Sequence, residues 1–204
     1  MPIPPTKHGL PAMACVSALQ KCIRRGLERE AMEFAVELHE TSKGFNTMLC
    51  NRLEIISHED ICIFSSPHIV PFVKACCDQA REWYDPKMLK PGKSRMAIGN
   101  AIRMMARAPK SREGDHFHVA VGLRAALEHY VPEIPDWAND GHTLVGKRMG
   151  RGLDFFREVS TQLYPAPAVA DPYEEEFYRL LALKARQPKT ATPGDFLGAE
   201  DQDE

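Results

Sequence analysis

The chain has 204 residues, of which 44% are hydrophobic and 26% charged, as is usual for globular proteins. It lacks both an apolar run of membrane-spanning length and the apolar core of a signal peptide, so we predict a cytoplasmic protein without a membrane span. The formal net charge is only −2, but bases and acids are segregated along the chain. Residues 87–112 hold eight bases and no acid, whereas residues 195–204 hold five acids and no base. This split indicates a localised anionic partner and an acidic tail.

Six helices are predicted before residue 131, because apolar residues recur there at intervals of three and four. The predicted segments are 12–25, 28–40, 45–56, a segment from Pro67 to Tyr84, 94–107, and a sixth helix that Ser111 or Asp115 caps and that includes Tyr130. The only β-like run, ICIF at 61–64, is interpreted as a tight connection between helices.

After Val131 the turn-forming composition favours loops or short helices, and residues 172–186 predict a last helix that begins acidic and ends basic. The fold class is therefore all-α, a compact multi-helix bundle with a flexible acidic C-terminal tail. The predicted divisions are an N-terminal arm (1–11), a helical domain (12–165), a C-terminal helix (166–186) and a disordered acidic tail (187–204).

Cysteine usage favours buried, reduced thiols over a metal site or disulfides. No pair has the C-x-x-C spacing, and most of the cysteines fall among apolar residues. The six are Cys15, Cys22, Cys50, Cys62, Cys76 and Cys77.

The segment PGKS (91–94) resembles the end of a phosphate-binding loop. A Walker A loop requires a glycine five residues before Gly92, where this chain has Lys87, and a buried strand leading into the loop. We therefore predict no nucleotide site and interpret Ser94 as the cap of a helix.

Two histidine-containing segments could suggest catalysis. In DHFH (115–118) the two histidines are two residues apart, so on a helix they point in nearly opposite directions and cannot share a metal. In SHED (57–60) a serine precedes a histidine and two acids, which we interpret as a capped helical turn. No catalytic residue, cofactor or metal is predicted, although an acid–base site of His58, Glu59 and Asp60 with the histidines at 116 and 118 stays open.

Basic residues give the strongest indication of a ligand. Arg103 and Arg107 share one face of a predicted helix, and two bases follow the turn at Pro109. Three more lie among the glycines of 146–152. Side chains of this kind could neutralise phosphates, and the alternative is an ordinary solvated face. The predicted nucleic-acid-binding residues are Arg103, Arg107, Lys110, Arg112, Lys147, Arg148 and Arg151.

Four segments in order resemble the C-terminal domain of the RarA/MgsA family, AAA+ recombination factors that include the Werner helicase-interacting ATPase. They are SALQKCIRRGLEREAMEFAVEL (17–38), RLEIISHEDICI (52–63), MARAPKS (105–111) and VPEIPDWANDGHTLVGKRMGRGLDFF (131–156). The likeness spans roughly residues 12 to 160. Cys62 replaces a usual glycine, and GRGLDF lacks the aromatic residues of the family's G-Y-G-K-G-Y.

This resemblance implies an oligomerisation domain similar to a clamp-loader collar, tetrameric in the family, that acts at replication forks with DNA or single-stranded DNA-binding protein. The family's ATPase module is missing from this sequence, so ATPase activity is not expected. A collar-only form would suit a viral or mobile-element genome, and then the host cytoplasm.

Two functions follow as hypotheses. The first is a non-enzymatic accessory protein of DNA replication or recombination that oligomerises and binds single-stranded or fork-like DNA or a replication partner. The second is a protein–protein adaptor for an AAA+ ATPase or replication protein, with no DNA contact of its own. In the first case the acidic tail could occupy the basic face, so that deletion of residues 195–204 should tighten DNA binding.

Overall fold

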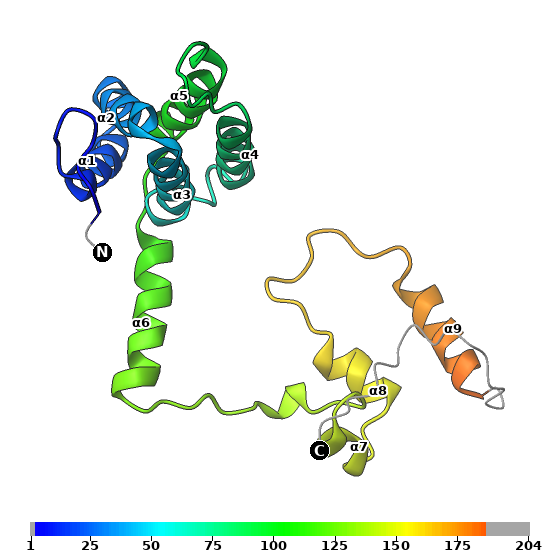
Figure 1. Cartoon of the computed structure of the whole chain (residues 1–204). Coiled ribbons are helices and arrows are strands. Elements are labelled where there is room, and N and C mark those ends of the chain that lie inside the picture. The colour runs from blue at the N-terminus through cyan, green and yellow to red at the C-terminus, as the bar shows by residue number, and fades with distance from the viewer. Residues whose placement is uncertain (1–2, 187–204) are drawn as a thin grey trace. The chain divides into compact units, whose positions relative to one another are not determined.

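The computed structural model describes residues 3–186, and the chain divides into two units, Met1–Val131 and Pro132–Glu204. The boundary lies within the predicted domain of 12–165, at the residue where the composition of the sequence changes. The described part is all-α and contains no strand (Figure 1). The predicted acidic tail of 187–204 lies outside the described residues.

Unit 1 contains six helices, as the apolar periodicity predicts. The first five pack together as a bundle, and the sixth adjoins the end of α3 (Figure 1). They are α1 (Ala12–Arg24), α2 (Glu28–Thr41), α3 (Lys43–Glu59), α4 (Ile69–Glu82), α5 (Gly92–Arg107) and α6 (Glu113–Leu127).

One apolar face of each of the first five helices forms the core of the bundle. In α1 this face consists of Val16, Leu19 and Ile23, which are fully or almost fully buried. Gly26 then takes a φ of +75°, a left-handed conformation that a glycine adopts without strain, and the chain turns into α2. The core continues through α2 to α5, whose innermost side chains include Leu38, Leu53, Val73, Ile98, Ile102 and Met105.

Two predicted serine caps are wrong, because both hydroxyls lie inside helices and donate to backbone carbonyls. The Ser57 hydroxyl donates to the Glu54 carbonyl one turn earlier in α3 (2.6 Å). The Ser94 hydroxyl is buried and donates to the carbonyl of Ala80 in α4 (2.8 Å), so it ties α5 to α4. The serine that does cap a helix is Ser42, whose hydroxyl accepts from the N–H of Phe45 and lets α3 begin earlier than predicted.

The six cysteines are free, which agrees with the prediction of reduced thiols. Four are buried and two, Cys22 and Cys62, are half-buried. Burial raises the pKa of the Cys15 and Cys76 thiols. None of the described cysteines belongs to a cluster of side chains that could hold a metal.

The ICIF segment is a connection, as predicted, and it also pairs with the link between α5 and α6. Ile61 forms an isolated antiparallel bridge with Lys110. The Cys62 N–H donates to the Pro109 carbonyl (3.0 Å), and the Ser111 N–H donates to the Asp60 carbonyl (3.2 Å). These bonds fix the start of α6 against the end of α3.

Unit 2 is made of short helices and loops, followed by one longer helix, as the sequence predicts. Its elements are η1 (Asp136–Ala138), α7 (Leu144–Arg148), α8 (Leu153–Phe155), the π-helical turn η2 (Phe156–Ser160) and α9 (Glu174–Arg186). No described helix in either unit is long and apolar enough to cross a membrane.

Gly146 shows how tightly unit 2 packs between η1 and α8. A Cβ atom at this position would lie 1.8 Å from the Asp140 carbonyl oxygen, so only glycine fits. The Thr143 hydroxyl caps α7 by accepting from the Gly146 N–H (3.0 Å). This glycine therefore serves packing within unit 2.

Candidate interaction surface

The predicted basic residues of unit 1 are mostly engaged within the protein. Arg107 forms two hydrogen bonds to the carboxylate of Glu28, both 2.8 Å long, and joins the end of α5 to the start of α2. This hydrogen bond lowers the pKa of Glu28 and raises that of Arg107. Sequence reasoning missed the pairing because 79 residues separate the two side chains.

Lys110 closes the end of α5. Its ammonium donates to the carbonyls of Met105 (2.8 Å), Ala106 (2.8 Å) and Ala108 (2.7 Å). An ammonium has three donors, so all of them are used. Burial lowers the pKa of Lys110. A phosphate could bind this side chain only if it left the carbonyls that it caps.

Arg112 belongs to a cluster around the fully buried Asp60. The Asp60 carboxylate accepts from Arg24 Nε (2.9 Å) and Gln20 Nε2 (3.0 Å), and Arg112 Nε lies 3.8 Å away. Arg112 also pairs with Asp115 in the first turn of α6. The cluster joins α1, α3 and the start of α6, so its guanidinium groups have a structural role.

Arg103 is exposed and has no ion-pair partner among residues 3–186. It lies at the edge of an open hollow of about 560 Å³ between α2 and α5. The floor of this hollow includes Met32, Val36 and Gly99, and its rim also carries Glu28 and Glu33. Arg29 lines the hollow too, and both acids are already paired, Glu28 with Arg107 and Glu33 with Arg29.

In unit 2 the three predicted bases divide into a structural arginine and two free cations. Arg151 binds the Asp136 carboxylate with Nη2 (2.6 and 2.8 Å), donates to the Asp136 and Asn139 carbonyls, and lies over the ring of Phe155. Lys147 and Arg148 are exposed in the last turn of α7, and neither forms an ion pair in the described part of the chain.

The residues considered for an acid–base site lie in two places. The carboxylates of Asp60 and Glu59 both accept from Gln20. His58 and His116 line one hollow together, while His118 lies 3.7 Å from Asp115.

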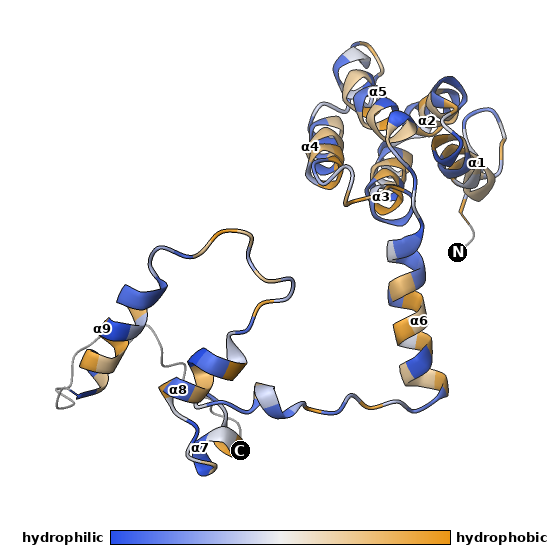
Figure 2. Cartoon of the chain, turned by 180° about the vertical axis from the view of Figure 1, so that it is seen from behind, coloured by the Kyte–Doolittle hydropathy of each residue, from blue (hydrophilic) through white to orange (hydrophobic). Residues whose placement is uncertain are grey.

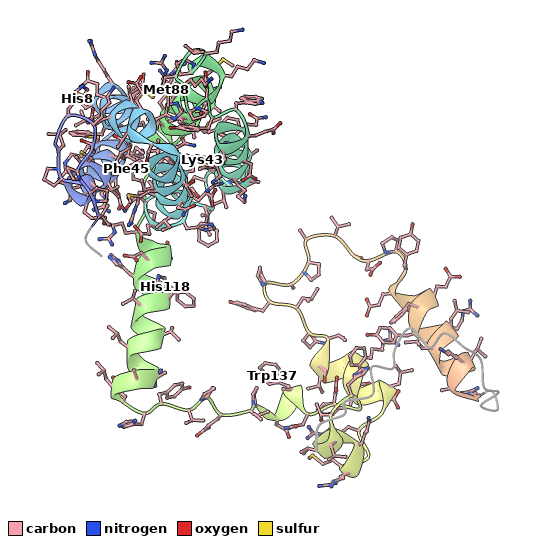
Figure 3. The ribbon with its side chains drawn as sticks, viewed as in Figure 1. His8, Lys43, Phe45, Met88, His118 and Trp137 are labelled. Carbon is pink, nitrogen blue, oxygen red and sulfur yellow. The ribbon has the colours of Figure 1, made fainter. Side chains whose placement is uncertain are left out.

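The most unusual surface is α6 itself. None of its 15 residues is buried, although eight of them are Phe, Val, Leu or Ala. Leu123 is 51% exposed, Val121 55% and Leu127 73%. Apolar colouring extends over most of the helix in Figure 2, and its side chains project from the ribbon with no other helix of unit 1 along its length (Figure 3). A helix that is apolar on most sides is normally buried.

The helix was predicted from the sequence, but its exposure was not. It ends at Leu127, earlier than predicted, because His129 takes a left-handed φ of +52° and Tyr130 folds back under Arg124. The signal that could have revealed the exposure is the run HVAVGLRAAL (118–127), in which Arg124 is the one formal charge. A helix that rests on a bundle through one face usually has a polar face as well.

An apolar hollow of about 820 Å³ lies at the foot of α6. Its walls come from the end of α3, the 61–64 connection and the first turns of α6. Ile63, Phe64 and Phe117 line it, and Phe64 is 81% exposed. Together α6 and this hollow form a continuous apolar surface, which we call the α6 surface. Contiguous apolar patches of this kind mark binding sites in soluble proteins.

No protein-family model matches this sequence, and no curated protein matches it either.

Proposed function

We propose that the protein is a non-enzymatic assembly module that recognises another protein through the α6 surface, with no direct contact to DNA. The exposed apolar helix α6 carries this proposal. Exposure of so many apolar side chains costs free energy in water, and a protein partner would remove that cost. The likeness to the RarA/MgsA C-terminal domain supports the same interpretation, because it suggests an AAA+ or replication protein as the partner.

The state of the basic residues also supports an adaptor. Arg107, Lys110, Arg112 and Arg151 already have carboxylate or carbonyl partners within the protein. Binding of a phosphate backbone would have to break these contacts, and only part of the counterion-release free energy would then remain.

Direct DNA binding is the second candidate, and a specific observation favours it. Arg103, Lys147 and Arg148 are exposed and unpaired among the described residues, as are three lysines near the start of α5: Lys87, Lys90 and Lys93. These side chains could bind phosphates without breaking an ion pair.

A salt titration of the full chain with single-stranded and forked DNA separates the two candidates. The adaptor predicts no binding at low salt for the full chain or for a chain lacking residues 195–204. A steep decrease of affinity with salt, reduced by Arg103→Glu or by Lys147→Glu with Arg148→Glu, would instead establish direct DNA binding.

The positive test of the adaptor uses two charge insertions on α6. Leu123→Arg should release whichever protein the full chain binds, because it places a charge on the apolar face that Leu123 shares with Val119 and Leu127. Val121→Arg, on the opposite side of the helix, should not. Since neither side chain is buried, both variants should keep the circular dichroism spectrum and melting temperature of the parent. If Leu123→Arg binds as tightly as the parent, the α6 surface is not the recognition site.

A further inference from the structure

The loop between α4 and α5, residues 83–91, has a conformation that its own hydrogen bonds define. The carboxylate of Asp85 accepts from the backbone N–H groups of Lys87 (2.9 Å), Leu89 (2.8 Å) and Lys90 (2.9 Å). Asp85 is the only acid of the loop, so the backbone engages the one negative charge that the loop contains. Neither lysine side chain of the loop forms an ion pair within residues 3–186.

An exposed apolar side chain lies between these lysines. Leu89 is 77% exposed, and Lys87 and Lys90 near it in the loop are exposed as well. The same combination continues into α5, where Lys93 is exposed in the first turn and Met96 is 59% exposed three residues later. A single exposed leucine is ordinary in soluble proteins. A leucine flanked by unpaired ammonium groups, however, has the composition of segments that bind membrane surfaces.

We propose that this loop binds the surface of a bilayer that contains anionic lipids, with Leu89 inserted among the headgroups and the lysines against the lipid phosphates. The lysines alone would suit the phosphates of a nucleic acid equally well. Leu89 distinguishes the two ligands, because it has no ring on which a base could stack, whereas the interface of a bilayer accepts an aliphatic side chain. Peripheral binding of this kind needs no membrane-spanning helix.

The acids at this end of the bundle do not cancel the lysines. Glu40, in the last turn of α2, pairs with both Lys7 and Arg95, which leaves one positive charge in excess. Glu82, the last residue of α4, is an exposed acid, and Lys43 at the start of α3 is an exposed base. These two charges offset each other, so the lysines of the loop set the sign of the local charge.

The loop and the α6 surface lie at opposite ends of the bundle. At the start of α3, Asn46 Nδ2 donates to the Ala80 carbonyl near the end of α4 (3.4 Å), whereas at the end of α3 the Asp60 carbonyl bonds the chain just before α6. Helix α3 has 17 residues and is therefore about 25 Å long. In Figure 3, Met88 of the loop and His118 of α6 lie on opposite sides of the bundle. A bilayer at the loop leaves the α6 surface free for a protein, so this inference goes beyond the proposed function and does not depend on it.

Flotation of the full chain with lipid vesicles tests the binding. The parent should bind phosphatidylcholine vesicles that contain phosphatidylserine, should not bind pure phosphatidylcholine, and should bind less tightly as salt is added. Lys87→Gln with Lys90→Gln should weaken binding about 25-fold, because each lysine near an anionic membrane contributes a factor of about five. Lys147→Gln with Arg148→Gln removes the same charge from unit 2 and should bind as the parent does. No binding by the parent, or equal losses in both double variants, would overturn the inference.

Two leucines of similar exposure test whether the ligand is lipid. Leu89→Ser should weaken vesicle binding about tenfold, because the side chain leaves water when the loop binds. Leu127→Ser, at a 73% exposed leucine of α6, should leave vesicle binding unchanged. Both variants should keep the circular dichroism spectrum of the parent, since neither side chain is buried. An unchanged affinity of Leu89→Ser would mean that the lysines bind phosphates without lipid, as on a nucleic acid, and would overturn the inference. A loss in Leu127→Ser as large as that in Leu89→Ser would place the lipid contact on α6 and overturn it as well.

Discussion

Helices α5 and α6 follow each other in the chain and have almost the same length, 16 and 15 residues, yet their environments are opposite. Seven residues of α5 are buried in the bundle, whereas none of α6 is buried. The bases and small residues of α5 leave one clear apolar face, and α6 is apolar around most of its circumference. The apolar content of a helix therefore does not by itself decide whether the helix is buried. Burial also needs neighbouring helices with a complementary apolar face, and unit 1 has such neighbours for α5 but not for α6.

The largest test of this comparison removes one aliphatic side chain from each helix. Ile102→Ala in α5 should lower the free energy of unfolding by about 2–5 kcal/mol, because the side chain is fully buried and leaves a cavity. Leu123→Ala in α6 should change it by less than about 0.5 kcal/mol, because this side chain is exposed. Urea unfolding followed by circular dichroism measures both. Similar losses would mean that α6 is part of the folded core.

Substitution of Asp60, whose cluster joins α1, α3 and the start of α6, should lower the free energy of unfolding almost as much. Asp60→Asn removes the negative charge that faces Arg24 and Arg112 and turns one acceptor oxygen into an N–H donor. It should cost about 3 kcal/mol, because the two guanidinium groups then lose the buried charge that balances theirs. Asp78→Asn, at an exposed position of α4, is the matched control, with a loss below about 1 kcal/mol. If the two variants have the same melting temperature, the Asp60 cluster does not stabilise the packing of α6 against α1 and α3.

Acidification should weaken the bundle through His39. Burial lowers the pKa of this histidine, and its Nε2 is the one buried side-chain nitrogen or oxygen in the described part without a hydrogen-bond partner. The folded state therefore takes up the proton less readily than the unfolded state, whose histidine has a pKa of about 6.5. Stability is complete above that value and falls as the pH drops through it. Melting temperatures across this range should fall more steeply for the parent than for His39→Gln.

The smallest expected effect concerns the end of α5. Lys110→Met removes the ammonium that caps three carbonyls and should cost about 1 kcal/mol. Lys93→Met, in the exposed first turn of the same helix, is the control and should be close to neutral. Thermal unfolding distinguishes them, and equal melting temperatures would contradict the capping role.

Sequence periodicity predicted the six helices of unit 1 because their core faces repeat at helical spacing. It could not predict the bonding partners of polar groups that pair with residues far away in the sequence. Ser94 was expected to cap its own helix but donates to Ala80 in α4, and Arg107 finds Glu28 far away in the chain. Both partners exist only once the helices are packed, so no local pattern encodes them.

The α6 surface could not be predicted from the sequence for a related reason. Periodicity indicates that a segment is helical, but burial depends on which faces its neighbours leave open. The hollow beside Phe64 forms only where the end of α3, residues 61–64 and the first turns of α6 meet. The sequence pattern of residues 61–64 predicted only a connection between helices. Lys147 and Arg148 are exposed, whereas Arg151, predicted with them to contact nucleic acid, binds the Asp136 carboxylate.

The order of packing in unit 1 has a kinetic consequence. Each of the first four helices packs against the next one in the chain, and the connections α1–α2 and α2–α3 have at most three residues. Folding therefore requires few distant segments to meet, a topology associated with rapid, microsecond-to-millisecond folding of helical bundles. Because α6 contributes nothing to the buried core, nucleation of the bundle does not wait for it. A nascent chain can acquire its stable part first, and α6 stays available for a later binding step.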